Sequence, residues 1–285
     1  MRELTDIKYL ESLFSRHGFN LKKGLGQNFL IDPTVCPSIA ECADIDDKGV
    51  IEIGPGAGVL TRELSKRAEK VVAIELDTKL MPVLSETLNG FDNVKVRFDD
   101  AMKCDLKALI EEEFGNMPVS VCANLPYYIT SPLIMRLLEE DLPIQSITVM
   151  VQKEAADRIC AEMGTRECGA VTAAVRYHSE PEIMFQVNRD SFLPPPKVDS
   201  SVIKLNVKSD NTLVNCNKDS FIKTVKAAFY TRRKTVVNSI SAALNIDKAT
   251  ISDALIKCGL DPNVRAEKIK FDEFVLLANT LFEVK

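Results

Sequence analysis

The sequence predicts an α/β fold with a mostly parallel sheet, followed by a small all-helical domain. Short β-branched runs alternate with amphipathic stretches through the first two-thirds of the chain, which is typical of βαβ units. Two later apolar runs are joined with no room for a crossover helix, so we expect them to pair antiparallel. Helical periodicity follows. We therefore expect an α/β catalytic domain with an N-terminal extension over 1–209 and a helical domain over 210–285.

The bulk composition is that of an ordinary globular protein. The 285 residues are 46% hydrophobic and 27% charged, and no apolar run is long enough to cross a membrane. The N-terminal segment lacks the apolar core of a signal peptide, so we expect a cytoplasmic protein without a membrane partner. The eight cysteines form no CxxC pair and there are only two histidines, which favours reduced, buried thiols and no metal site.

The individual elements follow from the local patterns. Strands are predicted at 49–54, 70–76, 93–98, 118–124 and 146–152, and the antiparallel pair at 181–187 and 200–207. Helices are predicted at 58–68, 77–88 and 131–140, and in the C-terminal domain at 220–244, 248–260 and 272–283.

A glycine-rich turn joins the first strand to the first of these helices. Gly54, Gly56 and Gly58 allow a tight turn and a close approach of a ligand to the backbone, and Glu75 ends the next strand about twenty residues further on. An acid there can accept both hydroxyls of a ribose, so a dinucleotide and S-adenosylmethionine both fit. The GxGxG spacing, Pro55 and the negative charge of Glu52 favour S-adenosylmethionine, whose sulfonium is cationic.

Two further strand ends carry polar residues. Asp99 and Asp100 follow the third strand, where a carboxylate could accept the adenine amine of a cofactor or cap the next helix.

The fourth strand ends in "NLPYY". The Asn124 side-chain oxygen and the Leu125 carbonyl could hold an aromatic amine with its lone pair facing a methyl donor, and Pro126 would stiffen that geometry. Tyr127 offers a face on which a flipped base can stack. We expect Tyr128 to be a core aromatic. Such a motif after a fourth strand indicates methyl transfer to a planar nitrogen.

Over nearly its full length the chain resembles the ribosomal RNA adenine dimethylase family, of the KsgA type. The resemblance depends on "GLGQNFL" (24–30), "IEIGPGAGVLT" (51–61), "AIELD" (73–77), "DDAMK" (99–103), "ANLPYYITSPL" (123–133), "VQKEAADRI" (151–159), "SFLPPPKVDSSV" (191–202) and "AAFYTRRKTVVN" (227–238). It implies a Rossmann-like, S-adenosylmethionine-dependent methyltransferase that dimethylates N6 of two adjacent adenosines. In that family they lie in a hairpin near the 3′ end of small-subunit rRNA.

The resemblance also implies roles for individual residues. Asn28 and Leu30 would lie near the methionine part of the cofactor, and Gly54 in the turn. Glu75 would bind the ribose, Asp100 the adenine, and Phe192 would pack the target base opposite Tyr127. The family commonly has glycine where this chain has Asp99, which leaves open which aspartate contacts adenine.

The net charge of −5 is weak evidence against a nucleic-acid partner, but the basic residues are concentrated in particular segments of the chain. Between Lys218 and Lys234 there are six basic residues and a single acid. With the resemblance, we expect RNA contacts from Lys22, Lys23, Lys197, Arg232, Arg233 and Lys234.

Other functions share some of these features. An Erm-type methyltransferase of large-subunit (23S) rRNA has the same fold and chemistry, and a ribosome-assembly factor could bind the small subunit with methylation as a secondary role. A DNA adenine methylase would carry a larger target-recognition insert. We expect a monomer that acts on the small ribosomal subunit, as a pre-30S particle.

Overall fold

The computed structural model describes residues 4–19, 28–208, 216–231 and 233–282. The chain forms two compact units, one of residues 1–156 and 181–207 and the other of residues 157–180 and 208–285. None of the described helices is both long and apolar enough to span a membrane.

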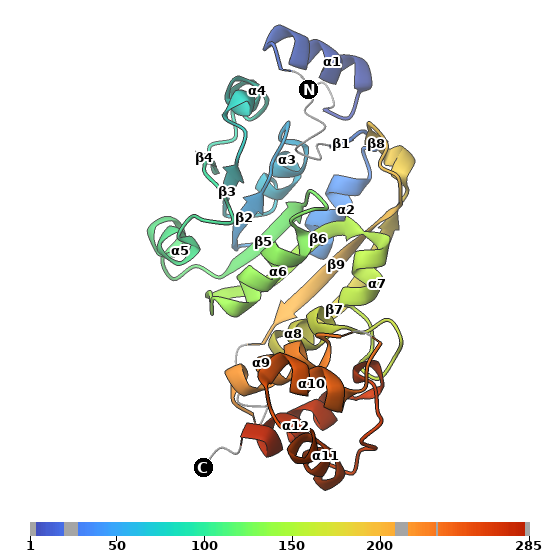
Figure 1. The fold of residues 1–285 in the computed structure, drawn as a ribbon. Helices are drawn as coiled ribbons and strands as arrows, with labels where there is room; N and C mark the ends of the chain where they lie inside the picture. The colour runs from blue at the N-terminus through green and yellow to red at the C-terminus, as the bar shows by residue number, and fades with distance from the viewer. Residues whose placement is uncertain (1–3, 20–27, 209–215, 232, 283–285) are drawn as a thin grey trace. The chain divides into compact units, whose positions relative to one another are not determined.

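A seven-stranded sheet forms the centre of the first unit (Figure 1). Its strand order is β4-β3-β2-β5-β6-β9-β7, and the strands from β4 to β6 are parallel. The strand bounds are β2 Gly49–Ile53, β3 Lys70–Glu75, β4 Val94–Phe98, β5 Val119–Asn124, β6 Ile144–Gln152, β7 Ser179–Val187 and β9 Ser200–Val207. All seven sequence-predicted strands are therefore present, with ends shifted by a few residues.

The first three strands run outward in the order β2, β3, β4, and β5 then pairs with the other side of β2. The chain thus reverses its direction of travel across the sheet between β2 and β5. In open α/β sheets a ligand binds at the carboxyl ends of the strands on either side of such a reversal. This topology brings the glycine-rich turn and the "NLPYY" turn to the same edge.

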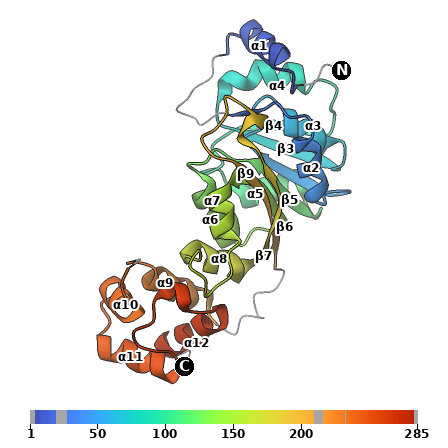
Figure 2. The same ribbon diagram turned by 90° about the vertical axis from the view of Figure 1, so that its right-hand side faces the viewer.

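Helices cover both faces of the sheet, as predicted. Buried side chains of α2 (Val35–Cys42) and α3 (Val59–Ser65) pack against Val50, Cys122, Met150 and Val202, which share one face. Both views place α6 (Thr130–Glu139) on the other face (Figure 2). The remaining helices of this unit include α1 Ile7–Arg16, η2 Thr78–Leu80, α4 Met81–Thr87, α5 Leu106–Phe114 and η3 Arg189–Ser191.

The last strands break the parallel pattern. β9 runs antiparallel to β6, with Val149 opposite Ile203, and β7 forms the edge of the sheet beside β9. The prediction that these two late runs pair with each other is confirmed, and the fold class of a mostly parallel sheet with an antiparallel strand is correct.

A second, two-stranded sheet was not predicted. β1 (Phe29–Leu30) pairs antiparallel with β8 (Phe192–Leu193), so that Leu30 lies opposite Phe192. The Ile31 N–H extends this ladder by donating to the Ser191 carbonyl at 2.9 Å.

The second unit is helical. Its helices are α8 Ala170–His178, α9 Lys218–Ala228, α10 Val236–Leu244, α11 Lys248–Lys257, η5 Ala266–Lys268 and α12 Phe271–Phe282, while α7 (Lys153–Ile159) contains the boundary between the units. Buried aromatic and aliphatic side chains, among them Tyr177, Phe221, Ile251 and Phe274, form its core. This unit also takes in residues 157–180. The division into a catalytic domain over 1–209 and a helical RNA-binding domain over 210–285 stays a prediction.

One predicted helix is wrong in extent. The run 220–244 forms two helices, because α9 ends at Ala228 and the Thr235 hydroxyl caps a new helix by accepting from the Asn238 N–H. The basic "FYTRRKT" segment therefore lies between helices.

All eight cysteines are free, but only Cys36, Cys122 and Cys168 are buried. The expectation of buried thiols holds for these three, whereas the others are half-buried.

Candidate active site

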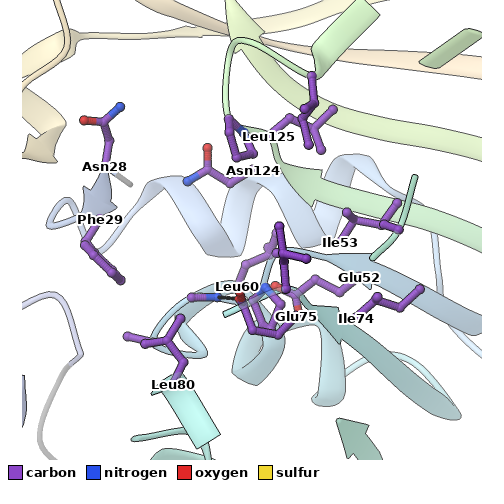
Figure 3. Close-up of a pocket in the computed structure, with 18 of the residues that line it drawn as sticks. Asn28, Phe29, Glu52, Ile53, Leu60, Ile74, Glu75, Leu80, Asn124 and Leu125 are labelled. Atoms are coloured by element: carbon purple, nitrogen blue, oxygen red, sulfur yellow. Dashed lines mark hydrogen bonds between the residues drawn. The ribbon is translucent and has the colours of Figure 1, made fainter. Parts of the chain in front are cut away.

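A cavity of about 300 Å³ opens at the carboxyl ends of β2, β3 and β5. This is the lower end of the size range of small-molecule sites. The sequence-predicted residues that line it are Asn28, Leu30, Glu52, Gly54, Gly56, Glu75, Asp100, Asn124, Leu125, Pro126, Tyr127 and Phe192. Figure 3 shows several of them around the space, with Asn28 and Asn124 among them. The structure thus collects residues from six separate stretches of the chain.

The glycine turn is held against Glu75. The Gly56 N–H donates to Glu75 Oε2 at 3.2 Å, and the Asp77 N–H donates to Oε1 at 2.8 Å. Burial raises the pKa of Glu75, while these two N–H groups act in the opposite direction. Because each carboxylate oxygen has a second lone pair, Glu75 can still accept hydrogen bonds from a ligand.

Gly58 does not line the cavity, although it was predicted to bind the cofactor. It caps α3 with φ of +85°, and a Cβ would come within 3.0 Å of a Leu88 methyl group. Glycine is needed here for the shape of the turn.

Glu52 is the most unusual residue of the site. Its side chain is buried at 1% exposure, and Oε2 has no hydrogen-bond partner among the described residues. Burial raises the pKa of Glu52 to about 8; Thr61 acts in the opposite direction, and the nearby Glu75 charge adds a smaller rise. At neutral pH the carboxyl group is therefore mostly protonated, and the negative charge expected from the sequence requires a cation or donor to stabilise it.

The loop after β4 carries both aspartates to the cavity. Asp100 accepts from the Met102 N–H at 2.9 Å and pairs with Lys103 at 3.1 Å, and these contacts lower its pKa. Asp99 accepts from the Asp100 N–H at 2.7 Å. Since both line the cavity, the assignment of the adenine contact to Asp100 stays a prediction.

Arg136 of α6 holds this aspartate loop in place through hydrogen bonds to its backbone. Its guanidinium donates to the carbonyls of Ala101 and Cys104, each at 2.6 Å, and to Glu140 at 2.7 Å. The helix that follows the "NLPYY" turn thereby also fixes the aspartate loop. The sequence offered no signal for this contact.

The "NLPYY" turn itself is rigidly anchored. The Leu125 N–H donates to the Met150 carbonyl at 3.4 Å, the Leu125 side chain is buried, and the Ile129 N–H donates to Pro126 at 3.1 Å. The side-chain amide of Asn124 has no hydrogen bond to the residues that the structure describes, so it is available to a ligand.

The two tyrosines differ in their surroundings. The Tyr127 hydroxyl is hydrogen-bonded to Ser200 Oγ at 2.9 Å, and burial raises its pKa. Tyr128 is 58% exposed and lines the rim of the cavity. The expectation that Tyr128 belongs to the core is wrong, because the turn directs its side chain outward.

The β1–β8 pair brings Asn28 and Leu30 to the same wall as Phe192. Phe192 is only 2% exposed, so its ring is part of the packed wall. Ser191 Oγ also donates to Asp32 Oδ2 at 3.2 Å, which ties the two segments together beside the strands. Leu76, which is 55% exposed, is a lining residue that was not predicted. Its position directly after Glu75, at the end of β3, is the signal in the sequence that could have indicated it.

The cavity is acidic. Glu52, Glu75, Asp99 and Asp100 line it, and no lysine, arginine or histidine of the described chain does. Such a lining favours a cationic ligand.

The predicted RNA contacts lie elsewhere or cannot be placed. Lys197 is exposed outside the cavity lining, and Arg233 and Lys234 are exposed between α9 and α10. Lys22, Lys23 and Arg232 lie outside the described residues.

Comparison with known proteins identifies relatives along the whole chain. The family model described as ribosomal RNA adenine dimethylase matches residues 18–283. A protein of Geobacillus thermodenitrificans named ribosomal RNA small subunit methyltransferase A is 45% identical over 276 residues, which cover 95% of this chain and 94% of the relative.

Two crystal structures share the fold. A dimethyladenosine transferase from Plasmodium falciparum is 28% identical with a TM-score of 0.73, covering 87% of this chain and 95% of its own. The 23S rRNA methyltransferase ErmE is 26% identical with a TM-score of 0.69, covering 90% of this chain and all of its own. The sheet is thus a Rossmann-like methyltransferase sheet, and the chain belongs to the ribosomal RNA adenine dimethylase family.

Proposed function

We propose that this protein transfers methyl groups from S-adenosylmethionine to N6 of two adjacent adenosines near the 3′ end of small-subunit (16S) rRNA. The observation that carries the proposal is the unpartnered amide of Asn124 at the end of β5, facing a cavity with Glu52 and Glu75 in a chain of this family. The 45% identity to a small subunit methyltransferase, against 26% to ErmE, favours the small subunit over the large one as substrate.

The lining residues fit S-adenosylmethionine. Glu75 would accept the ribose hydroxyls, since both oxygens are already oriented by backbone N–H groups. The buried, unpartnered Glu52 Oε2 lacks the donor that such an atom requires, and a cationic ligand supplies one. Asn28 and Leu30 would contact the methionine part, and Asp100 the adenine. When bound, the sulfonium supplies an activated methyl group.

The chain's own contribution to the chemistry is positioning. An adenine amine is a poor nucleophile because its lone pair is delocalised into the ring. The Asn124 side-chain oxygen and the Leu125 carbonyl would accept its two N–H groups and turn the lone pair toward the methyl group. Tyr127, held by Ser200, and Phe192 would contact the faces of the base.

RNA binding would involve both units. We propose that Lys197, Arg233 and Lys234 contact phosphates, together with Lys22, Lys23 and Arg232. A helical domain over 210–285 would serve this role, and the protein would act as a cytoplasmic monomer on the pre-30S particle.

Methylation of purified, unmethylated small subunits with labelled S-adenosylmethionine tests the proposal. We expect N6-dimethyladenosine by mass spectrometry, at two adjacent positions near the 3′ end of the 16S rRNA. Product in large-subunit RNA would support an Erm-type activity instead, and subunit binding without any product would support an assembly factor.

Asn124→Ala should lower kcat by about 10²-fold or more, since it removes an oriented hydrogen-bonding group from the reaction centre. Subunit binding should remain, because Asn124 is one contact in a large interface. Asn116→Ala, an exposed asparagine before the other end of β5, is the matched control and should behave as wild type. Loss of binding and catalysis together in Asn124→Ala would contradict the assigned role.

A further inference from the structure

Two aromatic side chains of the described residues are exposed: Tyr128 at 58% and Tyr230 at 67%. A single exposed apolar residue is ordinary on a protein surface. Tyr128 differs because it lines the rim of the cavity, directly after Tyr127 and four residues after Asn124. Because the ring is mostly exposed, packing in the core does not explain why a tyrosine lies at the rim of this cavity.

The backbone at Tyr128 is held on both sides. The Ile129 N–H donates to the Pro126 carbonyl at 3.1 Å, and Thr130, buried at 3%, begins α6 with its hydroxyl 3.5 Å from the same carbonyl. The Tyr128 hydroxyl makes no hydrogen bond to described residues. A rigid turn therefore presents a ring whose own groups have no partner.

The electrostatics of the rim limit what the ring can bind. Besides the mostly protonated Glu52, the lining contains Glu75, Asp99 and Asp100 and no cation among the residues that the structure describes, so phosphate groups would be repelled there. A base, in contrast, can be held by its face alone, because every nucleobase has a π surface that stacks on an aromatic ring.

We propose that Tyr128 is a stacking platform for the RNA nucleobase that neighbours the target adenosine. The inference rests on the proposed function, in which two adjacent adenosines are methylated in one site. While Asn124 holds the amine of one adenine, the neighbouring base is one nucleotide away, and Tyr128 is one residue away from the Tyr127 that contacts the target. Each adenosine would stack on Tyr128 while the other is methylated.

The test compares Tyr128→Ala, Tyr128→Phe and wild type. Affinity for unmethylated small subunits is measured by co-sedimentation, turnover by steady-state kinetics on the same subunits, and affinity for S-adenosylmethionine by calorimetry on the protein alone. Ile183→Ala, an apolar side chain of β7 that is 40% exposed outside the cavity lining, is the control.

We expect Tyr128→Ala to weaken subunit binding and raise KM for subunits by about 5- to 150-fold, the range measured for loss of one base–aromatic stack. S-adenosylmethionine affinity should change less than about 2-fold, and Tyr128→Phe and Ile183→Ala should match wild type, because the phenylalanine ring retains its stacking face.

Three results would overturn the proposal. Unchanged subunit affinity in Tyr128→Ala would show that the ring does not touch RNA. An equal loss of S-adenosylmethionine affinity would show that it covers the cofactor instead. A Phe variant as weak as the Ala variant would show that the hydroxyl is what matters. Failure of wild type to methylate small subunits would refute the proposed function, whereas the co-sedimentation comparison would still decide the role of Tyr128.

Discussion

Replacing Glu52 by glutamine should change the free energy of unfolding, and the difference from wild type should favour the variant more at alkaline pH than at acidic pH. The wild-type carboxyl group is buried, Oε2 lacks a partner among the described residues, and its pKa is raised from an ordinary 4.5 to about 8. The folded state therefore favours the protonated form. The stability that this group contributes is complete below pH 4.5 and is lost as the pH rises toward 8.

The size of the effect follows from the two pKa values. Between pH 5 and pH 8, ionisation in the unfolded chain lowers the wild-type free energy of unfolding by about 3 to 4 kcal/mol through Glu52 alone. Glutamine does not titrate. The stability of Glu52→Gln minus that of wild type should thus increase by this amount between the two pH values.

Urea unfolding of the ligand-free proteins at pH 5 and pH 8 measures this difference. Glu111→Gln, at an exposed position of α5, is the matched control for replacing a glutamate, and the Glu52→Gln result is compared with it. A Glu52→Gln difference that is the same at both pH values would refute the reasoning, because it would mean that the native carboxyl group ionises as freely as in the unfolded chain.

The same ionisation should appear in cofactor binding. If only the charged Glu52 binds S-adenosylmethionine well, wild-type affinity should rise by about 20-fold from pH 6 to pH 7.5, as the ionised fraction increases. In calorimetry, Glu52→Gln should bind more weakly and lack this rise. A pH-independent wild-type affinity would show that the cofactor does not interact with this carboxylate.

Three further substitutions test which contacts hold the site in place. Arg136→Lys should raise KM for S-adenosylmethionine by about 5- to 30-fold with a smaller change in kcat, because lysine cannot reproduce the fork that holds Ala101 and Cys104; an unchanged KM in steady-state kinetics would contradict this. Tyr127→Phe and Ser200→Ala should each lower kcat by about 3- to 10-fold, since either removes the 2.9 Å bond between them. Their double variant should lose no more than one single variant, and additive losses would show that the bond is not what orients the ring.

The sheet and much of the site could be predicted because their signals are local. For example, β2 is a short apolar run followed by Gly54, and β5 is an apolar run that ends in Asn124. Parallel strands place such ends at one edge, so Glu75 and Asn124 could be placed near one cavity from their positions in the sequence alone.

What could not be predicted depends on contacts between distant residues. Phe29 and Leu193 pair across more than 160 positions, and nothing in either segment alone marks a strand of two residues. The side chains of Tyr128 and Phe192 show the consequence. Tyr128, which was assigned to the core, is exposed, whereas Phe192 is buried where β8 pairs with β1.

A comparison of two buried glutamates, Glu113 and Glu52, explains why Glu52 is better understood as a ligand-binding group than as a structural one. Glu113 is also buried, with its side chain 4% exposed, but Lys70 lies 2.9 Å and Lys95 2.5 Å from its carboxylate, and these contacts lower its pKa. The fold thus neutralises a buried carboxylate with cations where only packing is at stake. At Glu52 no cation of the described chain is paired, and the pKa moves in the opposite direction. Burying Glu52 without a paired cation is unfavourable in the ligand-free protein. A cationic ligand that binds beside Glu75 and the Asn124 amide would donate to this carboxylate and balance its charge, which accounts for the presence of the glutamate.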